Sequence, residues 1–116
     1  MPLHVHTHFH PRRTGVTSHV EDIVQALQRK GRHTVALGES LNQDVPQIKR
    51  KDLEEQFRSG EQIIWHSHRP QSLREGLKLR ARWPQTRVVW THHSWRSPSW
   101  TTRRLIKQAN AVVCLT

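Results

Sequence analysis

The chain has 116 residues, of which 34% are hydrophobic and 24% are charged. That length fits one domain of ordinary size and excludes a complete (β/α)8 barrel, which needs about 250 residues. With 19 Lys and Arg against 9 Asp and Glu, the formal charge is +10, which predicts a surface that attracts the phosphates of nucleic acids, nucleotides or anionic lipids.

The sequence has few features that indicate a cellular compartment. Cys114 is the single cysteine, so an intramolecular disulfide and a cysteine-ligated zinc cage are both excluded. The first ten residues do not follow the pattern of a signal peptide, and no stretch approaches the roughly 20 apolar residues of a membrane-spanning helix. We therefore expect a cytoplasmic protein, either free or held at the inner face of the cytoplasmic membrane.

Short β-rich runs alternate with helical patterns along the chain, which is typical of a parallel sheet with helices on its faces. Strands are expected at residues 3–9, 33–37, 62–66, 87–91 and 111–115. Helices are expected from Val16 to near Gly31, around residues 48–57, and at 72–83 and 101–108. The predicted fold is one α/β domain over residues 1–116, a Rossmann-like doubly wound parallel sheet. Such a fold normally continues with a helix after the last strand, so we expect part of a longer protein.

Ten histidines are present, and seven of them lie toward the ends of three predicted strands. If the strands are parallel, these seven meet at the edge of the sheet where open α/β folds bind ligands. A single histidine of this kind is usually structural, and His4 and His33 are interpreted in that way, but the group favours a ligand site. The seven are His6, His8, His10, His66, His68, His92 and His93.

Metal chemistry is one interpretation of this edge. Alternation puts His4, His6 and His8 on one side of the first strand, which resembles the opening strand of metal-dependent hydrolases of the amidohydrolase and histidinol-phosphatase-like classes. Such sites also use carboxylates, and among the acidic residues only Glu39 follows a predicted strand. The hydrolase is therefore kept as an alternative.

Anion binding is the other interpretation. Gly15 lies in a turn between the first strand and the start of an amphipathic helix, where backbone N–H groups and the helix dipole attract a diphosphate. A glycine can also occur in a turn only because the backbone there adopts a positive φ angle, which other residues disfavour. Both explanations of Gly15 remain open from the sequence.

Four segments resemble those of the family 4 retaining glycosyltransferases, in the family's order and spacing. The first is residues 8–20, HFHPRRTGVTSHV, with Thr14 where the family commonly has a further glycine. The others are residues 63–69, IIWHSHR, residues 88–94, VVWTHHS, and residues 109–116, ANAVVCLT, in which Asn110 replaces a usual aspartate.

This resemblance implies the amino-terminal, acceptor-side domain of a GT-B enzyme that transfers sugar from a nucleotide-sugar donor to an acceptor hydroxyl with retention. The expected pathway is the synthesis of cell-envelope glycolipid, lipopolysaccharide or polysaccharide. The donor-binding carboxy-terminal domain is expected to be absent from this chain, which alone should not transfer sugar. No metal or other cofactor is expected.

The resemblance also assigns residues. Gly15 and Val16 would approach the donor diphosphate, and His93 would be the catalytic residue beside the donor sugar and the acceptor. The acceptor pocket would be lined by His8, His68, Arg69 and Arg96.

A basic surface is expected on two helices, from Arg74, Lys78, Arg82, Arg103, Arg104 and Lys107. It is either a solvated face or a docking face for anionic membrane. A nucleic-acid-binding module is a further alternative, which the tryptophans do not favour. Trp65 and Trp90 are expected in the core, while Trp95 and Trp100 are candidates for the rim of the acceptor cleft.

Overall fold

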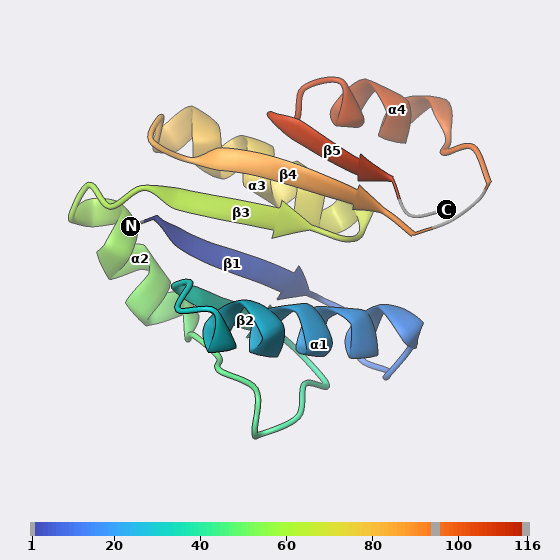
Figure 1. Cartoon of the computed structure of the whole chain (residues 1–116). Helices are drawn as coiled ribbons and strands as arrows, with labels where there is room; N and C mark the ends of the chain where they lie inside the picture. Colours follow the sequence, from blue (N-terminus) through green and yellow to red (C-terminus); the bar gives the residue numbers. More distant parts are fainter. Residues whose placement is uncertain (1, 94–95, 115–116) are drawn as a thin grey trace.

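A computed structural model of the chain describes residues 2–93 and 96–114. Its five strands form a single sheet of order β2-β1-β3-β4-β5, and every neighbouring pair is parallel, as the arrows of Figure 1 show. The strands are β1 (Leu3–His8), β2 (Thr34–Gly38), β3 (Ile63–Ser67), β4 (Arg87–His92) and β5 (Ala111–Cys114). The predicted Rossmann-like α/β fold is confirmed.

Helices connect the strands, as a parallel sheet requires. They are α1 (Gly15–Arg29), α2 (Arg50–Arg58), α3 (Pro70–Arg82) and α4 (Trp100–Ile106). Figure 1 shows α1 in front of the sheet and α2 and α3 behind it. None of the helices in the described part of the chain has the length and apolarity needed to cross a bilayer.

The face of the sheet under α2 and α3 carries the larger part of the core. Trp65 of β3 is fully buried there, and its Nε1 donates a hydrogen bond to the carbonyl of Ser72 in α3. Gly76 provides the space for this ring, because a Cβ at residue 76 would lie 2.4 Å from Trp65 Cδ1. Trp65 and Trp90 are thus core residues, as predicted.

The other face of the sheet has an aliphatic part and a polar part. Over β2, the apolar side of α1 packs on aliphatic residues, with Val20 and Val24 against Ala36 and Val45. Over β1 and β3, the period-two alternation instead presents imidazoles, beginning with His6, which is fully buried. A polar layer therefore lies within the domain where an aliphatic layer is usual.

Element boundaries differ from the predicted ones by one or two residues. β1 ends at His8, so Phe9 belongs to the following loop, and α3 begins at Pro70 because proline is favourable in the first turn of a helix. Gly31 has φ +77°, and its N–H donates to the carbonyl of Gln28, which confirms the predicted left-handed cap. Leu115, predicted at the end of the last strand, lies outside the described residues.

Candidate functional site

A network of side chains holds the start of α1 at the carboxyl edge of the sheet. Thr14 Oγ1 accepts a hydrogen bond from the N–H of Val16 at 3.2 Å, and Thr17 Oγ1 accepts one from the N–H of Thr14 at 2.8 Å. His8 then donates from Nδ1 to the carbonyl of Glu39 at 2.9 Å, and its Nε2 accepts from the Thr17 hydroxyl at 2.7 Å. Both nitrogens of this buried ring are engaged, so His8 positions α1. The contact of His8 with an acceptor sugar stays a prediction.

Gly15 is the exposed first residue of α1. It is not among the residues with positive φ, and a Cβ at residue 15 would have no neighbouring heavy atom within 4 Å. The positive-φ explanation left open by the sequence is therefore excluded. Because the first turn of α1 holds no acidic residue, no carboxylate there neutralises the positive end of the helix dipole, although Thr14 Oγ1 already accepts the hydrogen bond of the Val16 N–H.

Arg69 brings a cation to this helix end. It precedes α3, at the end of β3, and its Nη2 lies 3.4 Å from Thr14 Oγ1. The Nε atom of Arg69 is buried and has no hydrogen-bond partner. The guanidinium and the N-terminus of α1 thus meet at one place, which is a favourable arrangement for binding phosphate.

Five of the predicted site residues line one open cavity at this edge, with a volume of about 290 Å³. They are Val16, His68, Arg69, His93 and Arg96. Gly15 lies next to Val16 outside that lining, and His8 is buried below it. The carboxyl ends of β3 and β4 and the start of α1 therefore bring together residues that are far apart in the sequence, as the parallel topology predicts.

Histidines form a continuous row below the cavity. His6 Nδ1 lies 3.1 Å from His68 Nε2, and His68 Nδ1 lies 2.7 Å from His93 Nε2. Toward the amino ends of the strands, His4 Nε2 lies 3.1 Å from His66 Nδ1. The rings of His6 and His66 stack with their centroids 4.3 Å apart. The five imidazoles are thus linked from β1 across β3 to the end of β4.

This row is held in the neutral state. The pKa of His66 is lowered to about 3, first by burial and then by charge repulsion from His4, His19 and His93. The pKa of His93 is lowered to about 4, first by burial and then by His19, Arg69 and His92. Burial likewise moves the pKa of His6 and His68 well below the ordinary value. Neutral imidazoles accept hydrogen bonds and bind metal ions.

The seven histidines predicted at the edge do not form one group. His10 bonds locally to Arg12, and His92 Nε2 lies 3.0 Å from the carbonyl of Arg96. Two histidines outside the predicted seven take part instead, His4 within the row and His19 beside it. His4, interpreted as structural, stacks on His6 at 4.5 Å between ring centroids.

His19 of α1 is the second histidine that the strand-based argument missed. Its ring lies 4.9 Å from that of His93 and 5.7 Å from that of His68. Helical periodicity could have indicated it, because residue 19 follows Val16 by three and precedes Ile23 by four on the side of α1 that faces the sheet.

Two groups of three histidines have ligand atoms within 4.8 Å of one another among the described residues. They are His4, His6 and His66, and His19, His68 and His93. His8 belongs to neither group, so the His4, His6 and His8 set of the hydrolase alternative does not converge. No Asp or Glu lines the cavity above the row in the described part of the chain.

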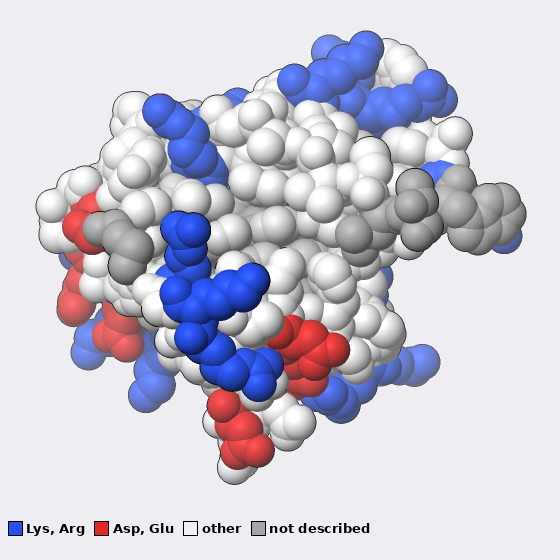
Figure 2. Space-filling model, in the orientation of Figure 1, with Lys and Arg blue, Asp and Glu red and all other residues white. Residues whose placement is uncertain are grey.

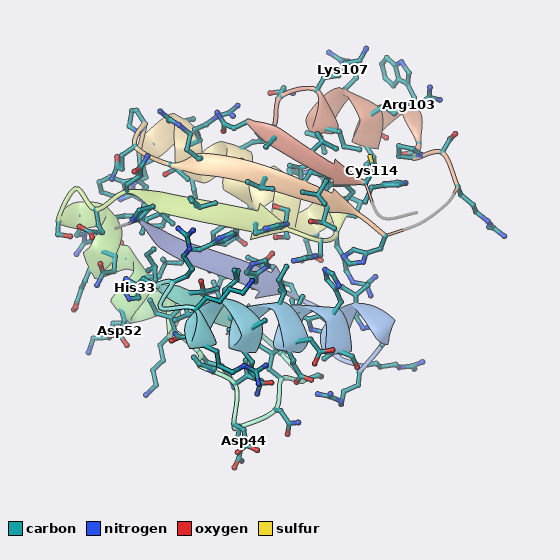
Figure 3. All side chains as sticks on the ribbon, in the orientation of Figure 1. His33, Asp44, Asp52, Arg103, Lys107 and Cys114 are labelled. Carbon is teal, nitrogen blue, oxygen red and sulfur yellow. The ribbon has the colours of Figure 1, made fainter. Side chains whose placement is uncertain are left out.

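The predicted basic residues of α3 and α4 are exposed. Figure 2 shows blue side chains gathered over α4, and Figure 3 shows Arg103 and Lys107 projecting from that helix away from the sheet. Trp100 is 67% exposed with the guanidinium of Arg104 4.9 Å from its ring centroid, and it does not line the cavity. The predicted cleft residue Trp95 lies outside the described residues.

No protein-family model, no curated protein and no solved structure matches this chain. A function for this chain therefore has to be inferred from its fold and from the arrangement of the site.

Proposed function

We propose that this chain is the amino-terminal, acceptor-side domain of a family 4 retaining glycosyltransferase. The observation that carries the proposal is the meeting of Arg69 with the N-terminus of α1 beside the unobstructed Gly15. In the proposed role these groups contact the diphosphate of a nucleotide-sugar donor. The sequence resemblance assigns the same place to the diphosphate, and the parallel topology supports it.

The transfer breaks the bond between the anomeric carbon and the donor diphosphate and forms a bond to an acceptor oxygen. Negative charge develops on the departing diphosphate, so a preorganised cation and helix N–H groups lower the barrier. Arg69 can supply the cation and Gly15 an N–H group, and the N–H of Val16 can join them where the diphosphate replaces Thr14 Oγ1 as its partner. Their positions are held by the Thr14, Thr17 and His8 network described above, which limits reorganisation during the reaction.

His93 is the proposed catalytic residue of this chain. Its ring borders the cavity, and its lowered pKa of about 4 keeps it neutral at pH 7. A neutral imidazole can accept a hydrogen bond from a sugar or acceptor hydroxyl and orient it. His68 and Arg96 are proposed to line the acceptor side of the same cavity, where Arg96 suits an anionic acceptor.

The basic surface of α3 and α4 is proposed to dock on anionic lipid. Trp100, exposed beside Arg104, has the amphipathic character of an interfacial anchor, and basic residues contribute about 1 kcal/mol each near such a surface. This role suits a glycolipid acceptor and a location at the inner face of the cytoplasmic membrane. The proposed enzyme takes its other donor contacts from a second domain.

Calorimetric titration of the chain with UDP, GDP and ADP tests the diphosphate site. Charge-assisted hydrogen bonds contribute about 1.5–3 kcal/mol, so Arg69→Met should weaken binding of the preferred nucleotide about 10- to 100-fold. Arg32→Met is the matched control, because Arg32 is exposed beside a different cavity that also contains His33. Equal weakening by both substitutions, or no nucleotide binding by the unmodified chain, contradicts the proposal.

A further inference from the structure

Three histidines from different elements meet beside the cavity, which His68 and His93 line: His19 of α1, His68 after β3 and His93 after β4. One nitrogen of each lies within 4.8 Å of the others. We propose that these three imidazoles bind a divalent transition-metal ion, with Zn²⁺ the preferred one and a fourth coordination position open to the cavity. The inference goes beyond the glycosyltransferase proposal and does not depend on it.

Ring orientation distinguishes this group from the other close group of histidines. The planes of His19, His68 and His93 are inclined to one another by 40°, 70° and 82°. In-plane lone pairs of rings inclined in this way can converge on one point. In the group of His4, His6 and His66 the rings are stacked, with angles of 12°, 17° and 25° between their planes. His4 Nε2 and His66 Nδ1 face each other at 3.1 Å, but the ring of His6 is stacked on both of these rings, so its in-plane lone pairs point past them and the group is poorly arranged for one ion.

The spacing is close to what Zn²⁺ requires. His68 Nδ1 and His93 Nε2 lie 2.7 Å apart. Bonds of about 2.0 Å in tetrahedral geometry put two ligating nitrogens about 3.3 Å apart. Small side-chain rotations therefore suffice. In the loaded site the ion takes the place of the proton between His68 and His93, and that proton moves to the other nitrogen of the ring that now donates it.

A second layer of contacts supports the ligands. When His68 binds metal through Nδ1, its Nε2 carries the proton and can donate to His6 Nδ1, which lies 3.1 Å away. His6 is 0% exposed and is stacked between other imidazoles, so this partner is rigidly held. Hydrogen bonds of this kind orient ligating histidines and tune their basicity.

The chemistry of the ligands selects the class of ion. Three nitrogen ligands with no carboxylate favour Zn²⁺, Cu²⁺, Ni²⁺ or Co²⁺ over Mg²⁺ and Ca²⁺, which require oxygen. Arg69 also lies at this edge, and its positive charge acts on His93. That charge favours an anion, such as a phosphate oxygen, over neutral water as the fourth ligand.

Metal binding can be measured on tag-free protein freed of metal with EDTA. Cys114→Ser serves as the parent, because an exposed free thiol such as Cys114 can bind metal on its own. Titration with Zn²⁺ against a chromophoric chelator should give one ion per chain, and Co²⁺ should give the visible absorption of a tetrahedral site. His19→Gln and His93→Gln should each weaken binding by at least about 100-fold, since even the partners of ligands contribute 10- to 100-fold.

His33→Gln and His4→Gln are the controls, since His33 is exposed before β2 and His4 belongs to the stacked group. Both should bind Zn²⁺ as the parent does. The ¹H–¹⁵N spectrum of each variant must retain the dispersion of a folded protein, and the two ligand positions, both half-buried, give independent readings. Absence of a stoichiometric site, or a loss of binding with His4→Gln but not with His19→Gln, overturns the proposal.

Discussion

The guanidinium of Arg69 lies over the first turn of α1, with its Nη2 3.4 Å from the hydroxyl oxygen of Thr14. The two residues are 55 positions apart in the sequence and follow two neighbouring strands, β3 and β1. Thr14 caps the helix, so Arg69 adds its charge where the helix dipole is already positive. Two cationic features at one point, with no acidic residue in that turn, favour a bound anion.

Gly15→Ala should weaken nucleotide binding without destabilising the protein. The added methyl group meets no protein atom within 4 Å, and alanine favours a helix more than glycine does. It projects instead into the space that the proposed diphosphate occupies. We expect affinity for the preferred nucleoside diphosphate to fall on the order of tenfold. The midpoint of thermal unfolding should be unchanged or higher.

Calorimetry and thermal unfolding of the same preparation check both parts of this prediction. A loss of stability would show that Gly15 has a structural role that its surroundings do not indicate. Unchanged affinity in a stable variant would place the diphosphate away from the first turn of α1.

Gly76→Ala should destabilise the domain, although the substitution favours the helix in general. A Cβ at this position lies 2.4 Å from Trp65 Cδ1, which is fully buried and cannot move aside freely. Overpacking of this kind costs about 1–3 kcal/mol, which exceeds the helix-propensity gain of about 1 kcal/mol. Urea unfolding measures the difference, with Gly15→Ala as the control. A Gly76→Ala variant as stable as the parent would mean that Trp65 repacks without cost.

Acid should weaken the fold through the row of buried histidines. An unfolded histidine binds a proton near pH 6.5, while His66 in the folded state does so only near pH 3. Between these values the unfolded chain binds more protons, so the free energy of unfolding falls as the pH falls. From pH 7.5 to pH 5 the loss from His66 alone is about 2 kcal/mol. Its neighbours in the row are His4, His6 and His68.

Urea unfolding at pH 7.5, 6.5, 5.5 and 5.0, in EDTA, measures this dependence. His66→Gln should flatten the profile, because one of the titrating groups is removed, even if the variant is less stable at pH 7.5. His33→Gln should leave the profile unchanged, since His33 is exposed in the folded protein. Constant stability of the parent across this range would contradict the neutral state of the row.

The sheet could be predicted because its signals are local. Alternating runs and helical spacing mark each element, and the order of strands and helices then implies a parallel sheet. The convergence of His68, Arg69 and His93 followed from that topology, since all three come after parallel strands. Element ends were less predictable, as at Pro70, where proline begins the helix and the prediction began it at Ser72.

The histidine row was not predictable in detail. Strand periodicity puts His4 and His6 on the same face, but which imidazoles touch depends on the register of β1 against β3, where His6 pairs with His66. His19 reaches the site from a helix, so its contact depends on how α1 packs on the sheet. His8 satisfies both of its ring nitrogens within the protein, and no pattern in the sequence indicates that.

Chemical-shift mapping of the ¹⁵N-labelled chain during titration with UDP, GDP or ADP tests whether a nucleoside diphosphate binds at the start of α1. We expect saturable shifts at the amides of Gly15 and Val16 and at the Nε–H of Arg69, which has no hydrogen-bond partner in the described part of the free protein. Saturable shifts confined to the opposite edge of the sheet, around Arg32 and His33, would contradict this expectation. So would changes spread over the basic surface of α4 without saturation.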